Sequence, residues 1–214
     1  MRPELLIWDF NGTILNDMEL CFAIENEMLS ERGMPPITRE WYLEHFSFPI
    51  RDYYIQMGYT FETESYERVS EVFMQRYNER FETCPLREGV LDALAAFQRA
   101  GIPQTLLSVT QQDDLERQAG KLGIAPFFSE MLGQVDIMGH SKVQRAKEYI
   151  TRIGIEPKDA LFIGDTDHDF EAAQAVGCPC VLLLHGHQSK NVLSRCGVPI
   201  YESAAAFRDA LLNE

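Results

Sequence analysis

Carboxylates that follow apolar segments are the residues of this chain whose types and spacing point most directly to chemistry. Asp9 comes directly after the apolar run Leu5–Trp8 and precedes Asn11, Gly12 and Thr13. A carboxylate that leaves a strand and enters a glycine-containing turn is placed to act as a nucleophile, and on phosphorus it would form an aspartyl-phosphate. The simpler interpretation is that Asp9 only caps the turn.

The second group of carboxylates indicates a metal. Asp165, Asp167 and Asp169 lie within five residues and follow the apolar run Leu161–Gly164. Three neighbouring acids repel one another unless a cation offsets them, and Mg²⁺ prefers such oxygen ligands. We expect Asp165 to be a direct ligand, whereas acids in the first turn of a helix also stabilise its dipole by about 0.3–1 kcal/mol.

The elements that must position these carboxylates can be read from the apolar pattern. Near-continuous apolar runs predict strands buried on both faces, at 5–8, 105–109, 160–164 and 180–184. From about residue 85 strands and helices alternate, which predicts an α/β fold with a parallel sheet. Asp9, Ser108 and Asp165 each lie at or next to a strand end, so they should meet in one crevice at the carboxyl edge of the sheet.

A helical insertion interrupts this alternation. Helical patterns without a convincing strand cover 18–31, 38–46, 49–57 and 64–82. We therefore predict an α/β core of residues 1–15 and 85–214 and a helical domain of residues 16–84. The hinges between them are expected near Leu15–Asp17 and Cys84–Gly89.

Four segments of the chain resemble, in order, the motifs of the haloacid dehalogenase (HAD) superfamily. Its phosphatases carry Asp-x-Asp-Gly-Thr where this chain has Asp9-Phe10-Asn11-Gly12-Thr13. Ser108 resembles the second motif, Lys142 in Gly139-His140-Ser141-Lys142 the third, and Gly164–Asp169 the fourth. The resemblance implies a Rossmann-like parallel sheet with helices on both faces. It also implies that the insertion is a helical cap of the type found in phosphoglycolate-phosphatase-like members, where the cap selects the substrate.

The resemblance also implies roles for single residues. Asp9 would be the nucleophile and a ligand of Mg²⁺, together with Asp165 and the backbone carbonyl of Asn11. Lys142 would offset charge on the nucleophile and the phosphoryl group, and Asp169 would act through a metal-bound water or by orienting Lys142.

The phosphoryl group would have its own contacts. Ser108 would hydrogen-bond it, as the second motif does in the family. The turn at Gly12 and Thr13 would aim backbone N–H groups at a phosphoryl oxygen, with Gly12 adopting a conformation closed to other residues.

Two further sets of residues are weaker candidates. Arg51 ends the loop 46–51, which we expect to face the core, and it could bind an anionic group of a small phosphorylated metabolite. The aromatic residues around it are more typical of helix packing than of a substrate platform. His185 and His187 follow the last predicted strand and could line the rim of the site, although loop histidines are more often solvated.

Asn11 is the position at which this chain departs from the family's first motif, and it determines the expected activity. The family's second aspartate protonates the leaving oxygen and activates water, and an amide cannot titrate. Losing such acid–base help costs about 10²–10⁴ in rate. The chain is then a slow or specialised phosphomonoesterase, a phosphotransferase whose phosphoenzyme persists, or a phosphometabolite-binding protein whose chemistry has lapsed. Dehalogenation needs no metal, so the acids at 165–169 disfavour it.

The composition excludes some classes of partner and indicates a cellular location. A formal charge of −14 disfavours nucleic-acid binding, and the apolar runs are shorter than the roughly 20 residues of a membrane span. An odd number of cysteines, five, and an N-terminus without a signal-peptide pattern indicate a cytoplasmic protein with reduced thiols. We therefore expect no nucleic-acid or membrane partner, and the sequence indicates no oligomeric state.

Overall fold

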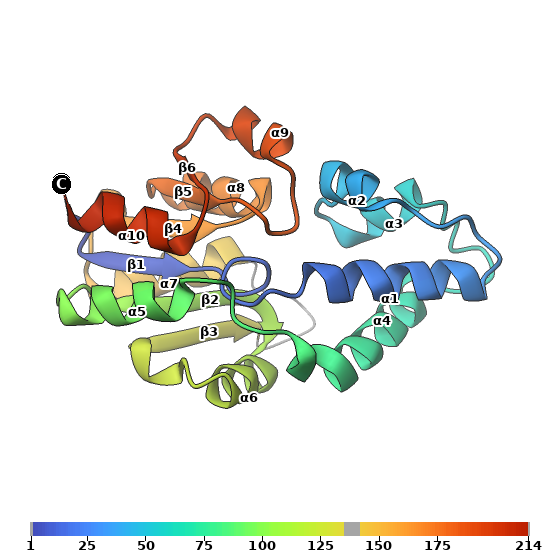
Figure 1. The fold of residues 1–214 in the computed structure, drawn as a ribbon, viewed down its shortest axis with the longest axis horizontal. Helices are drawn as coiled ribbons and strands as arrows, with labels where there is room; N and C mark the ends of the chain where they lie inside the picture. Colours follow the sequence, from blue (N-terminus) through green and yellow to red (C-terminus); the bar gives the residue numbers. More distant parts are fainter. Residues whose placement is uncertain (1, 135–141, 214) are drawn as a thin grey trace.

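A parallel sheet forms the centre of the protein. The structure is a computed structural model, and it describes residues 2–134 and 142–213. In the described part of the chain the sheet has six strands in the order β3-β2-β1-β4-β5-β6 (Figure 1). Every neighbouring pair is parallel. The strands are β1 (Leu5–Trp8), β2 (Gln104–Gln111), β3 (Glu130–Gln134), β4 (Ala160–Gly164), β5 (Cys180–Leu183) and β6 (Ile200–Tyr201).

Helices cover both faces of the sheet, so the predicted fold class is confirmed. Leu6 and Trp8 of β1 pack on one face, where the ring of Trp8 lies 6.1 Å from that of Phe97 and 6.0 Å from that of Phe207. Leu5 and Ile7 point the other way, into a second core. The first face is covered by α5 (Val90–Arg99) and α10 (Ala204–Leu212), and the second by α7 (Lys142–Ile153) and α8 (Asp167–Val176).

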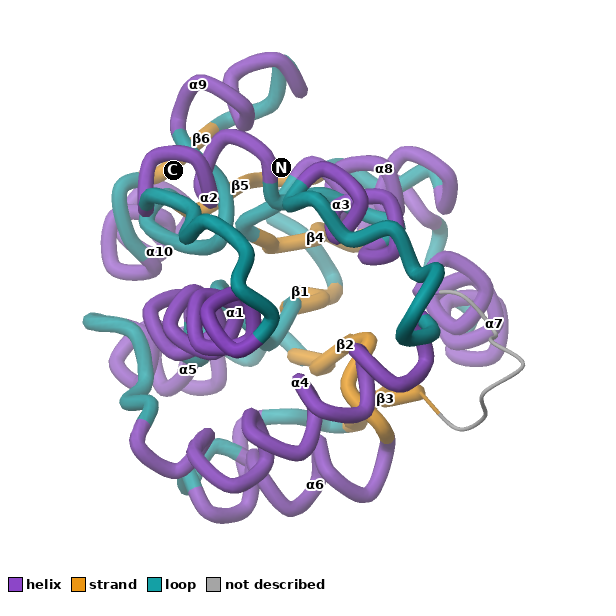
Figure 2. Tube along the Cα trace, turned by 90° about the vertical axis from the view of Figure 1, so that its right-hand side faces the viewer, coloured by secondary structure: helices purple, strands orange, loops and turns teal. Residues whose placement is uncertain are grey.

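The insertion between β1 and α5 is a helical cap. Its helices lie beyond the carboxyl ends of the strands (Figure 1), and the view along the molecule shows α1 in front of α5 and to one side of β1 (Figure 2). They agree with the predicted helices to within two residues at each end: α1 (Met18–Glu31), α2 (Arg39–His45), α3 (Ile50–Gln56) and α4 (Tyr66–Arg80).

Two chain segments join the cap to the core and run side by side. The backbone N–H of Asn16 donates to the carbonyl of Pro85 at 2.9 Å, and that of Arg87 donates to Ile14 at 2.9 Å. Leu15 and Leu86 form an isolated antiparallel bridge between them. The two segments where we expected hinges are therefore tied to each other.

The two edge strands were not predicted. β3 is Glu-Met-Leu-Gly-Gln, which is mostly half-buried, and β6 has two residues. Neither offers the continuous apolar run that marks a strand covered on both sides. The structure adds α6 (Gln112–Lys121), which agrees with the sequence pattern, and the short α9 (Lys190–Leu193), which the pattern did not indicate. No helix in the described ranges is long and apolar enough to cross a membrane.

Candidate active site

The register of the central strands brings the two acidic motifs together. Trp8 of β1 pairs with Ile163 of β4, and the backbone N–H of Asp9 donates to the carbonyl of Ile163 at 2.8 Å. Asp165 therefore leaves its strand beside Asp9. Carboxylate oxygens of Asp9, Asp165 and Asp169 lie within 4.8 Å of one another, at the edge predicted from the sequence.

Lys142 neutralises part of this acidic cluster. It is the first residue of α7, and its Nζ lies 2.5 Å from Oδ1 of Asp9 and 2.5 Å from Oδ1 of Asp169. Burial alone would lower the pKa of Lys142, but the charges of Asp169 and Asp9 outweigh it and raise that pKa. Lys142 thus stays cationic beside the candidate nucleophile. Residues 139–141 of its motif lie outside the described ranges.

The cluster has the donor set of a hard divalent cation. Burial raises the pKa of Asp9 to about 8 and that of Asp165 to about 6, although Lys142 opposes the first shift and His187 the second. A divalent cation would hold both carboxylates in their charged form, and carboxylate oxygens are the ligands that Mg²⁺ prefers. Asp9 and Asp165 can hold such an ion.

Both carboxylate oxygens of Asp169 are held by hydrogen bonds from the protein. Its Oδ2 accepts from the backbone N–H groups of Asp165 and Thr166, at 3.1 Å each, and from Oγ1 of Thr166 at 2.8 Å. Its Oδ1 accepts from Lys142. These contacts form a capping box at the start of α8 and orient the lysine, which was one of the two roles expected of Asp169.

The turn after Asp9 differs from the expected phosphate cradle. Gly12 has φ +74°, and a Cβ there would lie 2.2 Å from Oδ2 of Asp165, so this position requires glycine. The Gly12 N–H, however, donates to Oδ1 of Asp17 at 2.8 Å and to the carbonyl of Leu15 at 3.0 Å. The Thr13 hydroxyl donates to Oδ1 of Asp165 at 2.7 Å. In this structure both residues lie against the carboxylate of Asp165, and the Gly12 N–H already donates to Asp17 and Leu15.

Asn11 is held from both ends of its amide. Its Nδ2 donates to Oδ2 of Asp17 at 2.8 Å and to the hydroxyl of Tyr77 at 2.7 Å. Its Oδ1 accepts from Oγ1 of Thr110 at 2.9 Å and, at 3.4 Å, from Ser108. Ser108 is therefore close to the motif as expected, but it contacts Asn11, and Thr110 rather than Ser108 lines the cavity.

Asp17 is a site residue that the sequence did not reveal. It stands at the N-cap position of α1 but makes no capping hydrogen bond. Its two oxygens instead accept from Gly12, Asn11, Tyr77 at 2.7 Å and Nε2 of His187 at 3.3 Å. An aspartate before a helix is normally interpreted as a cap, so only the burial of Asp17 distinguishes it.

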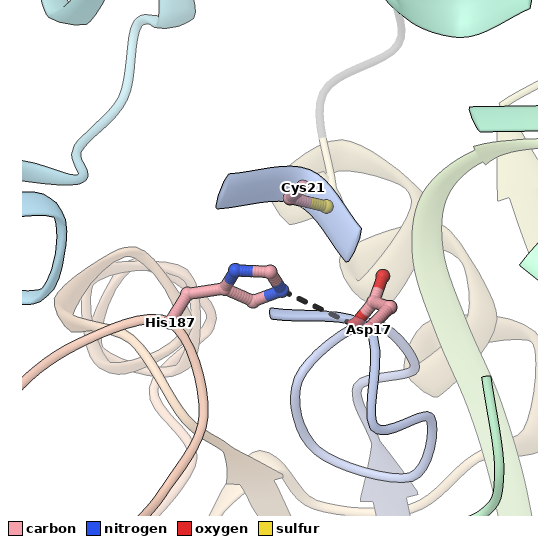
Figure 3. A group of neighbouring side chains, drawn as sticks. All are labelled: Asp17, Cys21 and His187. Atoms are coloured by element: carbon pink, nitrogen blue, oxygen red, sulfur yellow. Dashed lines mark hydrogen bonds and ion pairs between the residues drawn. The ribbon is translucent and has the colours of Figure 1, made fainter. Parts of the chain in front are cut away.

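His187 is the ionic partner of Asp17 and is buried rather than solvated (Figure 3). Burial would lower the pKa of His187, but the charge of Asp17 outweighs it and raises that pKa to about 9. Cys21 places its thiol in the same group. Each Asp17 oxygen accepts two hydrogen bonds, so in this structure Asp17 and His187 form a fully hydrogen-bonded ion pair. His185, by contrast, is exposed and faces Glu202.

These residues line a cavity of about 510 Å³ between the core and the cap. The core side presents Asp9, Asn11, Lys142 and Asp165, and the cap side is largely aromatic. Arg51 does not take part, because it is exposed and its guanidinium lies over the ring of Phe61. Arg51 is not among the residues that line the cavity, so in this structure it is not placed for the anion contact expected of it.

Glu25 of α1 is a second buried carboxyl on the cap side, and it gives a testable pH dependence. Burial raises the pKa of Glu25 from 4.5 to about 8. Its stabilising contribution is therefore complete below about pH 4.5 and lost as the pH rises through about 8. Over that interval the free energy of unfolding of the wild type should fall relative to Glu25→Gln by roughly 1–4 kcal/mol. Urea unfolding at a series of pH values measures the difference, and parallel curves would contradict the assignment.

Comparison with known proteins shows the family of the chain. Residues 6–183 match the family model described as haloacid dehalogenase-like hydrolase. Phosphoglycolate phosphatase 1 of Pseudomonas aeruginosa is 26% identical over 210 residues, covering 94% of this chain and 74% of that protein. The phosphoglycolate phosphatase of Synechococcus elongatus is 23% identical over 190 residues, covering 89% and 88%.

A solved structure extends the likeness to the fold. A HAD family hydrolase from Deinococcus radiodurans, crystallised with phosphate and sodium, superposes with a TM-score of 0.78 at 18% identity, covering 99% of this chain and 96% of its own. At this identity the match shows the fold alone. The family match and the phosphatase relatives show that the chain belongs to the haloacid dehalogenase-like hydrolase family and is an enzyme of its phosphatase type.

Proposed function

We propose that the protein is a Mg²⁺-dependent phosphomonoesterase that acts on a small phosphorylated metabolite through an aspartyl-phosphate at Asp9. One observation carries the proposal: Lys142 lies between Asp9 and Asp169, with Asp165 alongside, on the core side of the cavity. The core is taken as residues 1–15 and 85–214 and the cap as 16–84. Five free cysteines suit the cytoplasm.

The reaction would proceed in two balanced steps. A carboxylate oxygen of Asp9 attacks phosphorus while the bond from phosphorus to the substrate oxygen breaks, and Lys142 stabilises the added charge. Water then attacks the phosphorus of the aspartyl-phosphate, the bond from phosphorus to the Asp9 oxygen breaks, and the water loses a proton to solvent, which gives inorganic phosphate and the Asp9 carboxylate. A Mg²⁺ held by Asp9, Asp165 and the carbonyl of Asn11 would neutralise charge on the phosphoryl group. Ser108 and Thr13 would help to hold this arrangement, because Ser108 contacts Asn11 and Thr13 donates to Asp165.

Asn11 would make the first step slow. Its amide cannot give the leaving oxygen a proton, and both of its N–H groups already donate, to Asp17 and Tyr77. Esters with poor leaving groups should therefore lose about 10²–10⁴ in rate. The leaving alkoxide would then take its proton from solvent or from the substrate itself. A substrate with a good leaving group would be affected least.

Metal dependence is the first test. With Mg²⁺ the protein should hydrolyse an aryl phosphate, and a chelator should remove the activity until Mg²⁺ is restored. Hydrolysis that persists under chelation would contradict the proposal. A long-lived phosphoryl group on Asp9 would instead indicate transfer to another acceptor, and binding of phosphate without turnover would indicate lapsed chemistry.

A further inference from the structure

The cap side of the cavity has an unusual combination of aromatic rings and a buried carboxyl. Its apolar wall includes Phe46, Phe48, Tyr54, Tyr66 and Phe73. The rings of Tyr54 and Tyr66 lie 6.3 Å apart. Aromatic faces of this kind attract cations as well as apolar groups.

Glu25 lies in this wall and is almost fully buried, at 3% exposure. Its Oε2 accepts from the hydroxyl of Tyr53 at 2.7 Å. The neighbouring Tyr54 is close enough for the Glu25 charge to raise the pKa of its hydroxyl, after the larger effect of burial. Burial favours the neutral carboxyl of Glu25, and a positively charged group beside it would lower its pKa and hold it as the carboxylate.

The same cavity offers little to a substrate carboxylate. Among the described residues that line it, Lys142 is taken up by Asp9 and Asp169, and His187 by Asp17. His168 also lines it, but burial lowers its pKa, which favours the neutral ring. Arg51 lies outside. A substrate carboxylate would therefore find, among the described lining residues, no cation that lacks a carboxylate partner.

We propose, resting on the phosphomonoesterase function above, that the substrate is the phosphate ester of an amino alcohol. Its phosphoryl group occupies the Asp9 cluster, and its ammonium group lies against Glu25 and the aromatic wall of the cap. The cap thereby selects against phosphate esters that carry a carboxylate.

A matched series of esters tests the proposal on the wild-type protein with Mg²⁺. 3-Aminopropyl phosphate, n-butyl phosphate and 2-carboxyethyl phosphate have similar lengths but ends that are cationic, neutral and anionic. We expect kcat/KM for the amine to exceed that for the neutral ester by about tenfold, and that for the carboxylate by more. The difference should lie mainly in KM, because the ammonium does not react.

Variants then locate the effect. Glu25→Gln should remove most of the preference for the amine over the neutral ester. Glu27→Gln changes the same residue type on the exposed side of α1, where Glu27 pairs with Arg80, and should keep the preference. If Glu25→Gln does not fold, the ester series on the wild type decides alone.

The outcomes separate the two proposals. If an aryl phosphate is hydrolysed but the amine is not preferred, the substrate class is wrong and the phosphomonoesterase function stands. If neither hydrolysis nor a phosphoryl adduct on Asp9 is detected with any ester, the function is wrong and the substrate assignment falls with it.

Discussion

Asp9→Asn should abolish phosphomonoester hydrolysis, with a loss in kcat on the order of 10⁴-fold or more, as for other removed nucleophiles. The change keeps the shape of the side chain but removes the attacking carboxylate. Lys142 would retain Asp169 as a partner at 2.5 Å, so the helix start should remain in place. Rates with an aryl phosphate and an alkyl phosphate both measure the loss.

The matched control is Asp167→Asn, in the first turn of α8. Asp167 is paired with Gln188, at 2.8 Å between Oδ1 and Nε2, and does not line the cavity. Its loss should leave the rate nearly unchanged. An acid-quenched sample should show a phosphoryl group on the Asp9 peptide of the wild type and of Asp167→Asn, and none on Asp9→Asn. An adduct on another residue, or residual activity close to wild type in Asp9→Asn, would rule out Asp9 as the nucleophile.

The sequence predicted the residues of the cluster because local pattern determines them. Asp9 and Asp165 each follow a strand buried on both faces, and parallel strands present their carboxyl ends at one edge. The same reasoning predicted the four cap helices from their spacing. It left out β3 and β6 because edge strands are shorter or more polar and carry less of the apolar signal.

The residues that the sequence did not reveal depend on contacts between distant segments. Tyr77 lies 60 residues from Asp17 along the chain, and His187 lies 170 residues from it. Nothing near either residue in the sequence indicates that partner. The environment of Asn11 is set in the same way, since Thr110 and Tyr77 come from a strand and a cap helix. Local motifs thus predict the position of a carboxylate along the chain, whereas contacts with distant segments determine its pKa.

That packing shapes the outcome of restoring the missing acid. In Asn11→Asp the oxygen that replaces Nδ2 would face Oδ2 of Asp17, now 2.8 Å from Nδ2. Two carboxylates this close do not both ionise, so the pair should keep one proton with a raised apparent pKa. A carboxyl that is protonated near neutral pH is the group that a leaving oxygen requires.

We therefore expect Asn11→Asp to raise kcat for alkyl phosphates by about 10²-fold, and to raise it less for aryl phosphates, whose leaving groups need no proton. Because the shared pKa is raised, the gain should be full at low pH and fall as the pH rises through that pKa. Rate profiles over pH for both ester types measure it. Asn11-Gly12 is prone to deamidation, so the mass of the wild type must be confirmed first.

Asp17 provides the control that ties the gain to this pair. The double variant Asn11→Asp with Asp17→Asn exchanges the two groups, so that a carboxylate at position 11 faces an amide at position 17. The new aspartate then receives a hydrogen bond instead of a repelling charge, which lowers its pKa. The falling limb of the rate profile should move to lower pH relative to Asn11→Asp alone. If Asn11→Asp brings no gain with alkyl phosphates at any pH, Asn11 does not limit the rate. The leaving group then has another proton source, and His187, a buried cation that pairs with Asp17 at 3.3 Å, is the residue to replace next.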